Sequence, residues 1–306
     1  MKKIIIPILV LLLLTGYTPY VEVNDLVIVD MLGLEKVGND YILTINTVYE
    51  EKDNNATKSI YKDYVFKGKS LGKVFLEAKK INTKKAYYGH LKLVVFQSKL
   101  LDNELINYFQ KEFKEMNYLI IGTDSRINDL FKKYNSSSKI IKAVNKEKIS
   151  NADIHLATFE DYLKDIVNKK RTSTLPVVSL NNNNLVVKGL ETYQKNILLS
   201  KEQAKITYLL NNKITSFHQS IKLNDKYYEV EFNNVKVLYQ QDKINLLMDI
   251  KCSDTSNKKI KELKKVIQEL FRKEIDELLT FQNDNNIKLV LPSNDINIII
   301  GADKND

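Results

Sequence analysis

The sequence predicts an α+β fold with two or three domains, each a mostly antiparallel sheet with flanking helices. Three observations support this prediction. Among the 306 residues, 43% are hydrophobic and 28% charged, as is ordinary for a globular protein with a sizeable core. Strand-like alternation and helix-like spacing of apolar residues both recur along the chain. The two patterns mix without the regular strand–helix alternation that is typical of a parallel α/β sheet.

The first seventeen residues have the pattern of an export signal. Lys2 and Lys3 precede an uninterrupted apolar run over residues 4–14. This run is shorter than the roughly 20 apolar residues that a membrane-spanning helix needs, so it is typical of the core of a signal peptide. We therefore expect residues 1–17 to be a signal peptide or a short anchor, and the mature chain to lie outside the cytoplasm.

The end of this segment lacks an acceptor for a lipid. Leu14, Thr15 and Gly16 form the sequence that precedes the acylated cysteine of a lipoprotein, but the next residue is Tyr17. A tyrosine has no thiol to carry a diacylglycerol, so we expect no lipidation at this position. Three alternatives stay open: an uncleaved anchor, inefficient cleavage, or a sequence variant at Tyr17.

The N-terminal part of the mature chain mixes strands with amphipathic helices. Ser70 can cap a helix, because Leu71, Val74, Phe75 and Ala78 then fall on one face. Further helices are expected over residues 101–116, 127–134 and 159–167, with a loop at 135–138. Strands are expected over residues 26–34, 41–49, 61–66, 91–96 and 118–121.

The remaining elements begin with a hairpin. Two strands, 175–180 and 185–190, flank an asparagine-rich turn. Ser200 and Gln203 fit a capping box that opens a helix through residue 210. The elements expected after it are a strand-rich stretch over 214–250, a long amphipathic helix over 258–279, and two closing strands, 287–291 and 296–300.

The domain boundaries follow from these elements. After the export segment at 1–17, we expect an N-terminal region over residues 18–199 and a C-terminal α+β domain over 200–306. A weaker boundary lies near residue 117. No internal repeat is visible in the sequence.

The charge pattern argues against a nucleic-acid partner. The formal net charge is +9, yet only Arg126, Arg171 and Arg272 of the 47 basic residues are arginine. Base and phosphate readers depend on the planar fork of arginine, and the lysines here interleave with acids without forming a basic block. A weak preference for anionic lipid headgroups stays open. The single cysteine, Cys252, allows no internal disulfide and is expected to pack as a small hydrophobe.

The motifs that could carry chemistry favour structural roles. Gly68, Lys69 and Ser70 resemble the end of a phosphate-binding loop, but such a loop needs a glycine where this chain has Asp63. His90, His155 and His218 have no histidine or cysteine at metal-ligand spacing. We therefore expect neither a catalytic set nor a cofactor. An exported hydrolase with a dispersed site is the weakest alternative, and a cleft that gathers His, Asp, Glu or Ser would support it.

Several short motifs follow one another between about residues 13 and 205. Each motif alone is common, but their order along the chain is more specific. Together with the export signal, they resemble the Ger(x)C family, the C subunits of spore germinant receptors. Leu14, Thr15 and Gly16 stand where this family has the residues before its acylated cysteine. The other positions that carry the resemblance are Asn24, Asp25, Gly33, Gly68, Ser70, Gly89, His90, Leu91, Pro176 and Gly189.

The resemblance implies a GerAC-like subunit without chemistry of its own, lipid-anchored at the outer face of the spore inner membrane. There it would accompany two polytopic membrane subunits, of the A and B types, in a complex that triggers germination by nutrients. This chain departs from the family at Tyr17 and in a shorter stretch between residues 279 and 296. The alternative function is an envelope binding protein for a small soluble ligand, which requires a pocket with convergent polar groups. Because Gly89 and Gly189 both adjoin strands, we expect valine at either position to cause misfolding.

Overall fold

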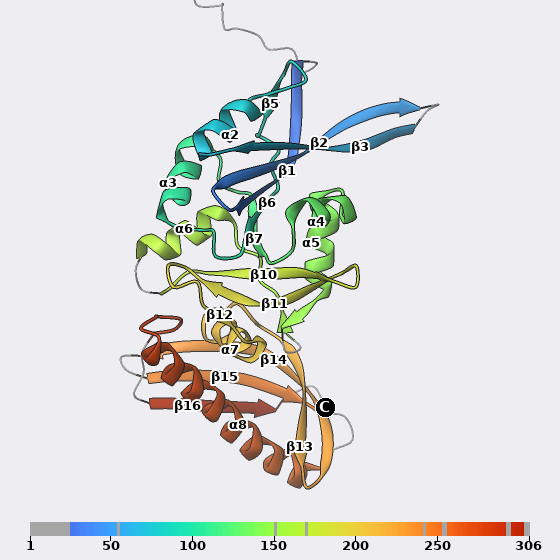
Figure 1. The fold of residues 1–306 in the computed structure, drawn as a ribbon. Coiled ribbons are helices and arrows are strands. Elements are labelled where there is room, and N and C mark those ends of the chain that lie inside the picture. The colour runs from blue at the N-terminus through green and yellow to red at the C-terminus, as the bar shows by residue number, and fades with distance from the viewer. Residues whose placement is uncertain are drawn as a thin grey trace, which may run out of the picture.

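The protein is built from two β-sheets that lie one above the other, with helices packed around them (Figure 1). The computed structural model describes residues 25–53, 56–149, 152–168, 171–240, 243–252, 256–291 and 295–302. The expected export segment, Tyr17 and Asn24 lie outside these residues. Among the helices in the described ranges, none combines the length and hydrophobicity that a membrane span requires.

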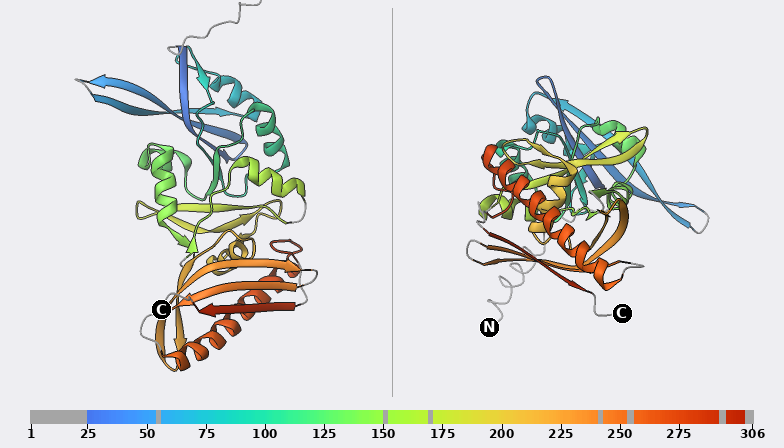
Figure 2. Two further views of the ribbon diagram at one scale, coloured as in Figure 1. Left: turned by 180° about the vertical axis from the view of Figure 1, so that it is seen from behind. Right: turned by 90° about the horizontal axis from the view of Figure 1, so that it is seen from below.

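The first sheet is 10-stranded within the described residues and runs in the order β12-β11-β10-β7-β6-β1-β2-β3, with β4 and β5 at the side of β1. Its long strands β2 and β3 form a ribbon that extends well beyond the helices (Figures 1 and 2). The strands of this sheet are β1 (Leu26–Val37), β2 (Asp40–Asp53), β3 (Ala56–Gly68), β4 (Lys80–Ile81), β5 (Lys84–Tyr87), β6 (Leu93–Gln97), β7 (Leu119–Thr123), β10 (Thr174–Asn181), β11 (Asn184–Thr192) and β12 (Leu198–Leu199).

The centre of this sheet is parallel and its flanks are antiparallel. β6 pairs in parallel with both β1 and β7, and β7 pairs in parallel with β10. On either side, β1–β2–β3 and β10–β11–β12 are antiparallel. The parallel strands β6 and β7 are short and buried on both faces, so they show no alternation that would reveal their direction.

Helices cover both faces of the first sheet. On one face lie α2 (Leu71–Ala78), α3 (Asn103–Glu112) and α6 (Phe159–Asn168), around a core that includes Phe75 and Phe109. On the other face lie α4 (Ile127–Lys133) and α5 (Ser137–Lys146). The helix α5 begins inside the stretch that was expected to be a loop, so that prediction was wrong beyond residue 136. The sequence signal was weak because two serines open the helix after the N-cap Ser136, and serine competes with helix formation in such positions.

The second sheet is 6-stranded in the described part of the chain, with the order β16-β15-β14-β13-β9-β8. Its core joins Phe217, Phe232 and Phe271, whose rings lie 4.4 to 6.0 Å apart. The elements are β8 (Lys148–Ile149), β9 (Ala152–Asp153), β13 (Phe217–Leu223), β14 (Lys226–Gln240), β15 (Lys243–Lys251), α8 (Asn257–Asp284) and β16 (Asp295–Ala302). The amphipathic α8 packs on this sheet and leads to β16, which pairs in parallel with β15.

The helix α7 (Lys201–Leu210) lies between the two sheets, in contact with β11 and β12 of the first and with β14 and α8 of the second. Its sequence is buried nearly all round, as expected for a helix enclosed on every side. The predicted capping box is present: Ser200 accepts from the Gln203 amide, and the Gln203 side chain accepts from the Ser200 amide. One continuous hydrophobic core therefore runs from β1 through α7 to β16.

Residues 287–291 are not a strand, which corrects one of the two closing strands expected from the sequence. Ile287, Leu289 and Val290 are buried as their apolar character requires. Their backbone is satisfied outside a sheet, by turn and loop contacts. Side chains contribute: the Asn211 amide donates to the Leu289 carbonyl at 3.1 Å, and the Val290 amide donates to Gln282 at 3.2 Å. The other closing strand is present as β16.

The proposed boundary at residue 200 stays a prediction. β8 and β9 precede it in the chain but pair within the second sheet, where β9 joins β13. The N-terminal region therefore contributes strands to both sheets.

Candidate functional site

The last residues of the first family motif hold the helix α4 on the strand β1. Gly33 faces α4 so closely that a Cβ atom there would overlap Ile127 and crowd Phe131 at 3.2 Å. Two residues further on, the buried carboxylate of Glu35 accepts a hydrogen bond from the Ile127 amide at 3.2 Å. That amide belongs to the first turn of α4, where a negative charge complements the helix dipole. The Leu-Gly-Leu-Glu motif thus seats a helix.

A second carboxylate of β1 does the same for α5. Asp30 is buried, and it accepts from the Ser137 amide at 2.7 Å and from the Ser137 hydroxyl at 2.8 Å. The N-cap residue Ser136 makes no side-chain capping bond of its own. Lys92 lies 3.7 Å from the same carboxylate. One strand therefore supplies the caps of two helices that follow it by about a hundred residues.

The second motif forms a turn from β3 into α2. Gly68 is buried, and a Cβ atom there would lie 3.0 Å from Val74. Ser70 caps α2 as predicted, because its hydroxyl accepts from the Lys73 amide at 3.3 Å. Asp40 pairs with Lys69 at 2.7 Å and with Lys67 at 3.1 Å. The pKa of Asp40 is lowered by the hydrogen bond from Lys69 and, to a smaller extent, by the one from Lys67.

The third motif lies in an exposed turn before β6. Gly89 and His90 are exposed, whereas Leu91 is buried and its amide donates to the Tyr88 carbonyl at 2.9 Å. The His90 ring meets the Tyr87 ring edge-on at 5.7 Å. Asp25, just before β1, is also exposed. These three positions therefore lie on the surface, whereas Leu91 belongs to the core.

The fourth motif shapes the hairpin of β10 and β11. Pro176 is buried in β10 opposite Leu190, and the register shifts at the next residue pair. On β11, a Cβ atom at Gly189 would overlap the backbone carbonyl of Leu199. Gly189 therefore allows β12 to approach β11 closely, and Pro176 lies next to the register shift of the hairpin.

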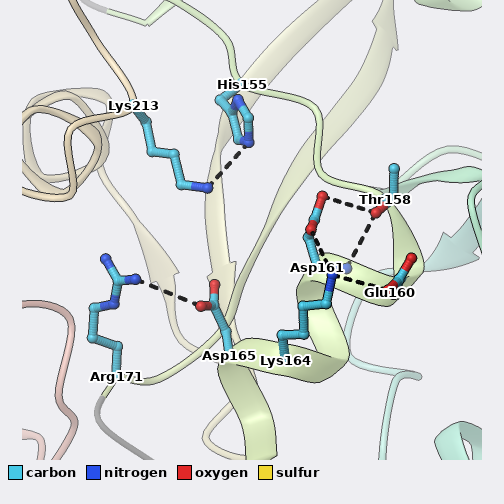
Figure 3. A network of polar contacts seen from close by, with 8 residues as sticks. All are labelled: His155, Thr158, Glu160, Asp161, Lys164, Asp165, Arg171 and Lys213. Atoms are coloured by element: carbon cyan, nitrogen blue, oxygen red, sulfur yellow. Dashed lines mark hydrogen bonds and ion pairs between the residues drawn. The ribbon is translucent and has the colours of Figure 1, made fainter. Parts of the chain in front are cut away.

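A polar network joins the two halves of the molecule on the side of α6 and α7 (Figure 3). His155 lies between β9 and α6, and its Nε2 atom is 3.2 Å from the ammonium of Lys213. The Tyr208 hydroxyl of α7 donates to the His155 carbonyl at 2.9 Å. Below it, Arg171 pairs with Asp165 at 3.6 Å and donates to Asn211 at 2.6 Å. The contacts thus link α6 to the segment that follows α7.

The chemistry of this network follows from its partners. A lysine ammonium can only donate, so Nε2 of His155 accepts and the ring proton belongs on Nδ1. The pKa of His155 is lowered, mainly by burial and to a smaller extent by the positive charge of Lys213. The negative charges of Asp161 and Asp165 partly oppose this shift. The neutral ring faces a cation instead of a hydroxyl or thiol, so His155 is not arranged to activate a nucleophile. The network is suited to a structural role, which is to hold α6 against the segment that follows α7.

Thr158, which is part of the same network, caps the N-terminus of α6. The Thr158 hydroxyl donates to the Asp161 carboxylate at 2.9 Å and accepts from the Asp161 amide at 3.1 Å, which caps α6. Lys164 pairs with Glu160 at 2.9 Å and contacts Asp161 at 3.8 Å. The adjacent cavity, lined by His155, Asp165 and Arg171, measures about 30 Å³, far below the volume of a small-molecule site.

From the sequence, His155 could not be distinguished from the other two histidines. In the structure it is the one that joins the polar network, through Lys213. His218 is exposed on β13, and His90 is exposed in its turn. Cys252 is half-buried and packs against the hydrophobic core. Across the described ranges, no group of three or more His, Cys, Asp or Glu side chains is arranged to hold a metal ion.

The chain matches a known protein family. The family model is described as Spore germination protein N-terminal domain, and it matches residues 19–180. A search of curated protein sequences finds no match. Among solved structures, the crystal structure of the GerBC protein aligns with a TM-score of 0.47 and 12% identity, over 88% of this chain and 96% of that one. Because the family model covers more than half of the 306 residues, the chain belongs to the GerAC-like family of spore germination proteins.

Proposed function

We propose that this chain is a non-catalytic subunit of a nutrient-germinant receptor, located at the outer face of the spore inner membrane and needed for the germination response. The family match over residues 19–180 carries the proposal. The apolar run at residues 4–14 supports export, and the described domains then lie on the outer side of the membrane.

The structural roles of the motif residues support a subunit without catalytic activity. Gly33, Gly68 and Gly189 stand at close packing contacts, and Ser70 caps a helix. Each of these four residues thus has a structural role in this chain, which suits a protein that acts through its surface in a complex with the A-type and B-type membrane subunits.

Germination of spores that lack the chain tests this function. We expect such spores to lose or slow their response to at least one nutrient, and a restored full-length copy to recover it. A copy with Gly189→Val should fail, because β11 cannot pack against β12, whereas a copy with Gly89→Val should restore the response. Immunoblots of dormant spores would show whether each copy accumulates.

The measurement must include spores that also lack any other C-type chain of the same receptor class, since a second copy could mask the loss. A normal response of these spores to every nutrient that the parent recognises would refute the proposed function.

A further inference from the structure

A lysine-lined groove runs between the α4–α5 pair and the β10–β11 hairpin. Figure 1 shows α5 beside the turn end of this hairpin. The groove has a volume of about 680 Å³. The polar and charged side chains along it are Lys133, Tyr134, Lys139, Lys142, Lys146 and Glu147, joined by Asn184 at the start of β11. Four cations thus face a single carboxylate.

The walls of the groove are fixed to each other. The Leu185 amide donates a hydrogen bond to the phenol oxygen of Tyr134 at 3.1 Å, which ties the hairpin to the end of α4. Because that oxygen accepts a hydrogen bond there, its own O–H group can donate a hydrogen bond elsewhere. Ile140 and Val144 of α5 are buried in the core, and this fixes the rotation of the helix. The groove is therefore formed before any ligand arrives.

Helical spacing brings three of the lysines to one side of α5. Lys139, Lys142 and Lys146 follow each other at intervals of three and four residues, which places them on one face. At a rise of about 1.5 Å per residue, their attachment points span roughly 10 Å along the helix. Like charges at such spacing repel and destabilise an isolated helix. The helix itself contains no acid to offset them.

The charges are also not neutralised by neighbouring elements. Several exposed lysines elsewhere have acidic partners; Lys67 and Lys69, for example, share Asp40. In the part of the chain that the structure describes, Lys139 donates to the Asn135 side chain at 2.7 Å, but none of the four groove lysines forms an ion pair. Residues 130–146 contain no Asp or Glu at all. The expectation that the lysines form no basic block was therefore wrong for this stretch.

We propose that this groove is a binding site for an anion that carries two or more phosphate or carboxylate groups. Its volume falls in the range of small-molecule sites, and it is lined by a few polar donors above apolar surface from Ala143, Leu185 and Val186. Lysine ammonium groups act as point charges toward such anions, and the Tyr134 hydroxyl and Asn184 amide add neutral donors. The anion is either a free solute or the headgroup of an anionic lipid.

Binding by the full-length chain tests the site with defined probes, with the chain in detergent micelles for the soluble anions and diluted below the critical micelle concentration for the vesicles. The probes are inorganic pyrophosphate, citrate, and vesicles of neutral lipid with or without an anionic phospholipid. The test variant is Lys139→Gln with Lys142→Gln and Lys146→Gln. The matched control removes the same charge at three exposed lysines outside the groove: Lys84→Gln, Lys85→Gln and Lys226→Gln. Circular dichroism establishes that both variants fold.

We expect the wild type and the control to bind pyrophosphate or citrate, and the groove variant to bind roughly tenfold or more weakly. That result identifies a free solute. If only anionic vesicles bind, and the groove variant alone loses this binding, the site recognises a lipid headgroup. Equal binding by the groove variant and the control, or no binding of any probe to the wild type, would overturn the proposal. A receptor role tested by germination is independent of this result.

Discussion

Gly189 and Gly89 carry similar sequence signals but have different surroundings. A side chain at Gly189 would collide with the backbone carbonyl of Leu199, which cannot move without displacing β12. A side chain at Gly89 would meet only the end of the exposed Tyr87 side chain. The structure therefore supports the prediction that valine disrupts the fold at Gly189, and leads us to expect a milder effect at Gly89 than the sequence suggested.

The two substitutions should differ in their effect on stability. We expect Gly189→Val to lower the free energy of unfolding by at least about 3 kcal/mol, because a backbone clash cannot relax locally. Gly89→Val should cost less than about 1 kcal/mol. Urea denaturation of the purified chain measures both. Equal losses would show that Leu199 does not approach Gly189 as described.

His155 should make stability depend on pH. Its pKa is lowered in the folded chain relative to the usual 6.5, so the unfolded chain binds more protons in the interval below 6.5. The contribution of the neutral ring is therefore complete above pH 6.5 and is lost as the pH falls toward the folded pKa. We expect His155→Gln to have a smaller drop in Tm between pH 7.5 and 5.5 than the wild type.

The matched control for this measurement is His218→Gln, since His218 is exposed. Glutamine at 155 can still accept from Lys213, which separates loss of titration from loss of the contact. A His155→Gln chain with the same pH dependence as the wild type would contradict the assignment.

At the scale of elements, the caps from β1 to α4 and α5 are the most specific feature of the first sheet. Removing the carboxylate in Asp30→Ala leaves the Ser137 amide and hydroxyl without their acceptor in the interior. We expect a loss of about 1–3 kcal/mol in the free energy of unfolding. As a control, Glu160→Ala removes an exposed i,i+4 pair with Lys164, and solvent screening should make its effect on stability negligible.

Those two values are to be compared by urea denaturation under the same conditions. If Asp30→Ala is as mild as the control, water can replace the carboxylate and the caps do not hold α5 in place.

The helices α7 and α8 are joined by a buried ion pair. The Lys205 side chain is 2% exposed, and its ammonium lies 3.1 Å from Glu274 and 5.4 Å from the centre of the Phe271 ring. In Glu274→Ala the buried ammonium loses its counter-charge, so we expect a cost of about 3–5 kcal/mol. Replacing both partners, as Lys205→Met with Glu274→Leu, should recover most of that loss.

The exposed pair of Lys273 and Glu277 on the same helix provides the comparison, because Glu277→Ala should cost under about 0.5 kcal/mol. Thermal denaturation of the four chains measures the set. A Glu274→Ala chain as stable as Glu277→Ala would mean that Lys205 reaches water.

The sequence predicted elements well where local pattern and chemistry agree. The helix at Ser70, the capping box at Ser200 and Gln203, and the long amphipathic helix α8 are all confirmed. It failed where tertiary contacts replace local signals. The helix α5 begins with serines and takes its cap from Asp30 in a distant strand. Residues 287–291 have an apolar strand-like pattern, but Asn211 and Gln282 bind their backbone instead.

The same reasons explain what could be foreseen of the candidate sites. The motif order pointed to the family, but it could not place Gly33 against α4 or Glu35 at its first turn. The meeting of His155 with Lys213 depends on how α7 lies between the sheets. The groove on α5 had a local signal, the acid-free run over residues 130–146, which the average charge pattern of the chain concealed.

At the scale of the whole molecule, the shared core should make the two sheets unfold together. Met31 of β1, Leu209 of α7 and Ile298 of β16 belong to one hydrophobic cluster. We expect a single transition in urea, with far-UV and tyrosine near-UV circular dichroism coinciding. Two separate transitions would show that the sheets are independent units, and would favour a domain boundary near residue 200.

The most direct test of the receptor role is co-purification of a tagged full-length chain from the detergent-solubilised inner membrane of dormant spores. Mass spectrometry identifies the proteins that accompany it, with an untagged strain as the control. We predict recovery of the two polytopic membrane subunits, of the A and B types, which would also show that Tyr17 does not prevent assembly. Recovery of the chain alone, or only in the soluble fraction, would contradict its place in a germinant receptor.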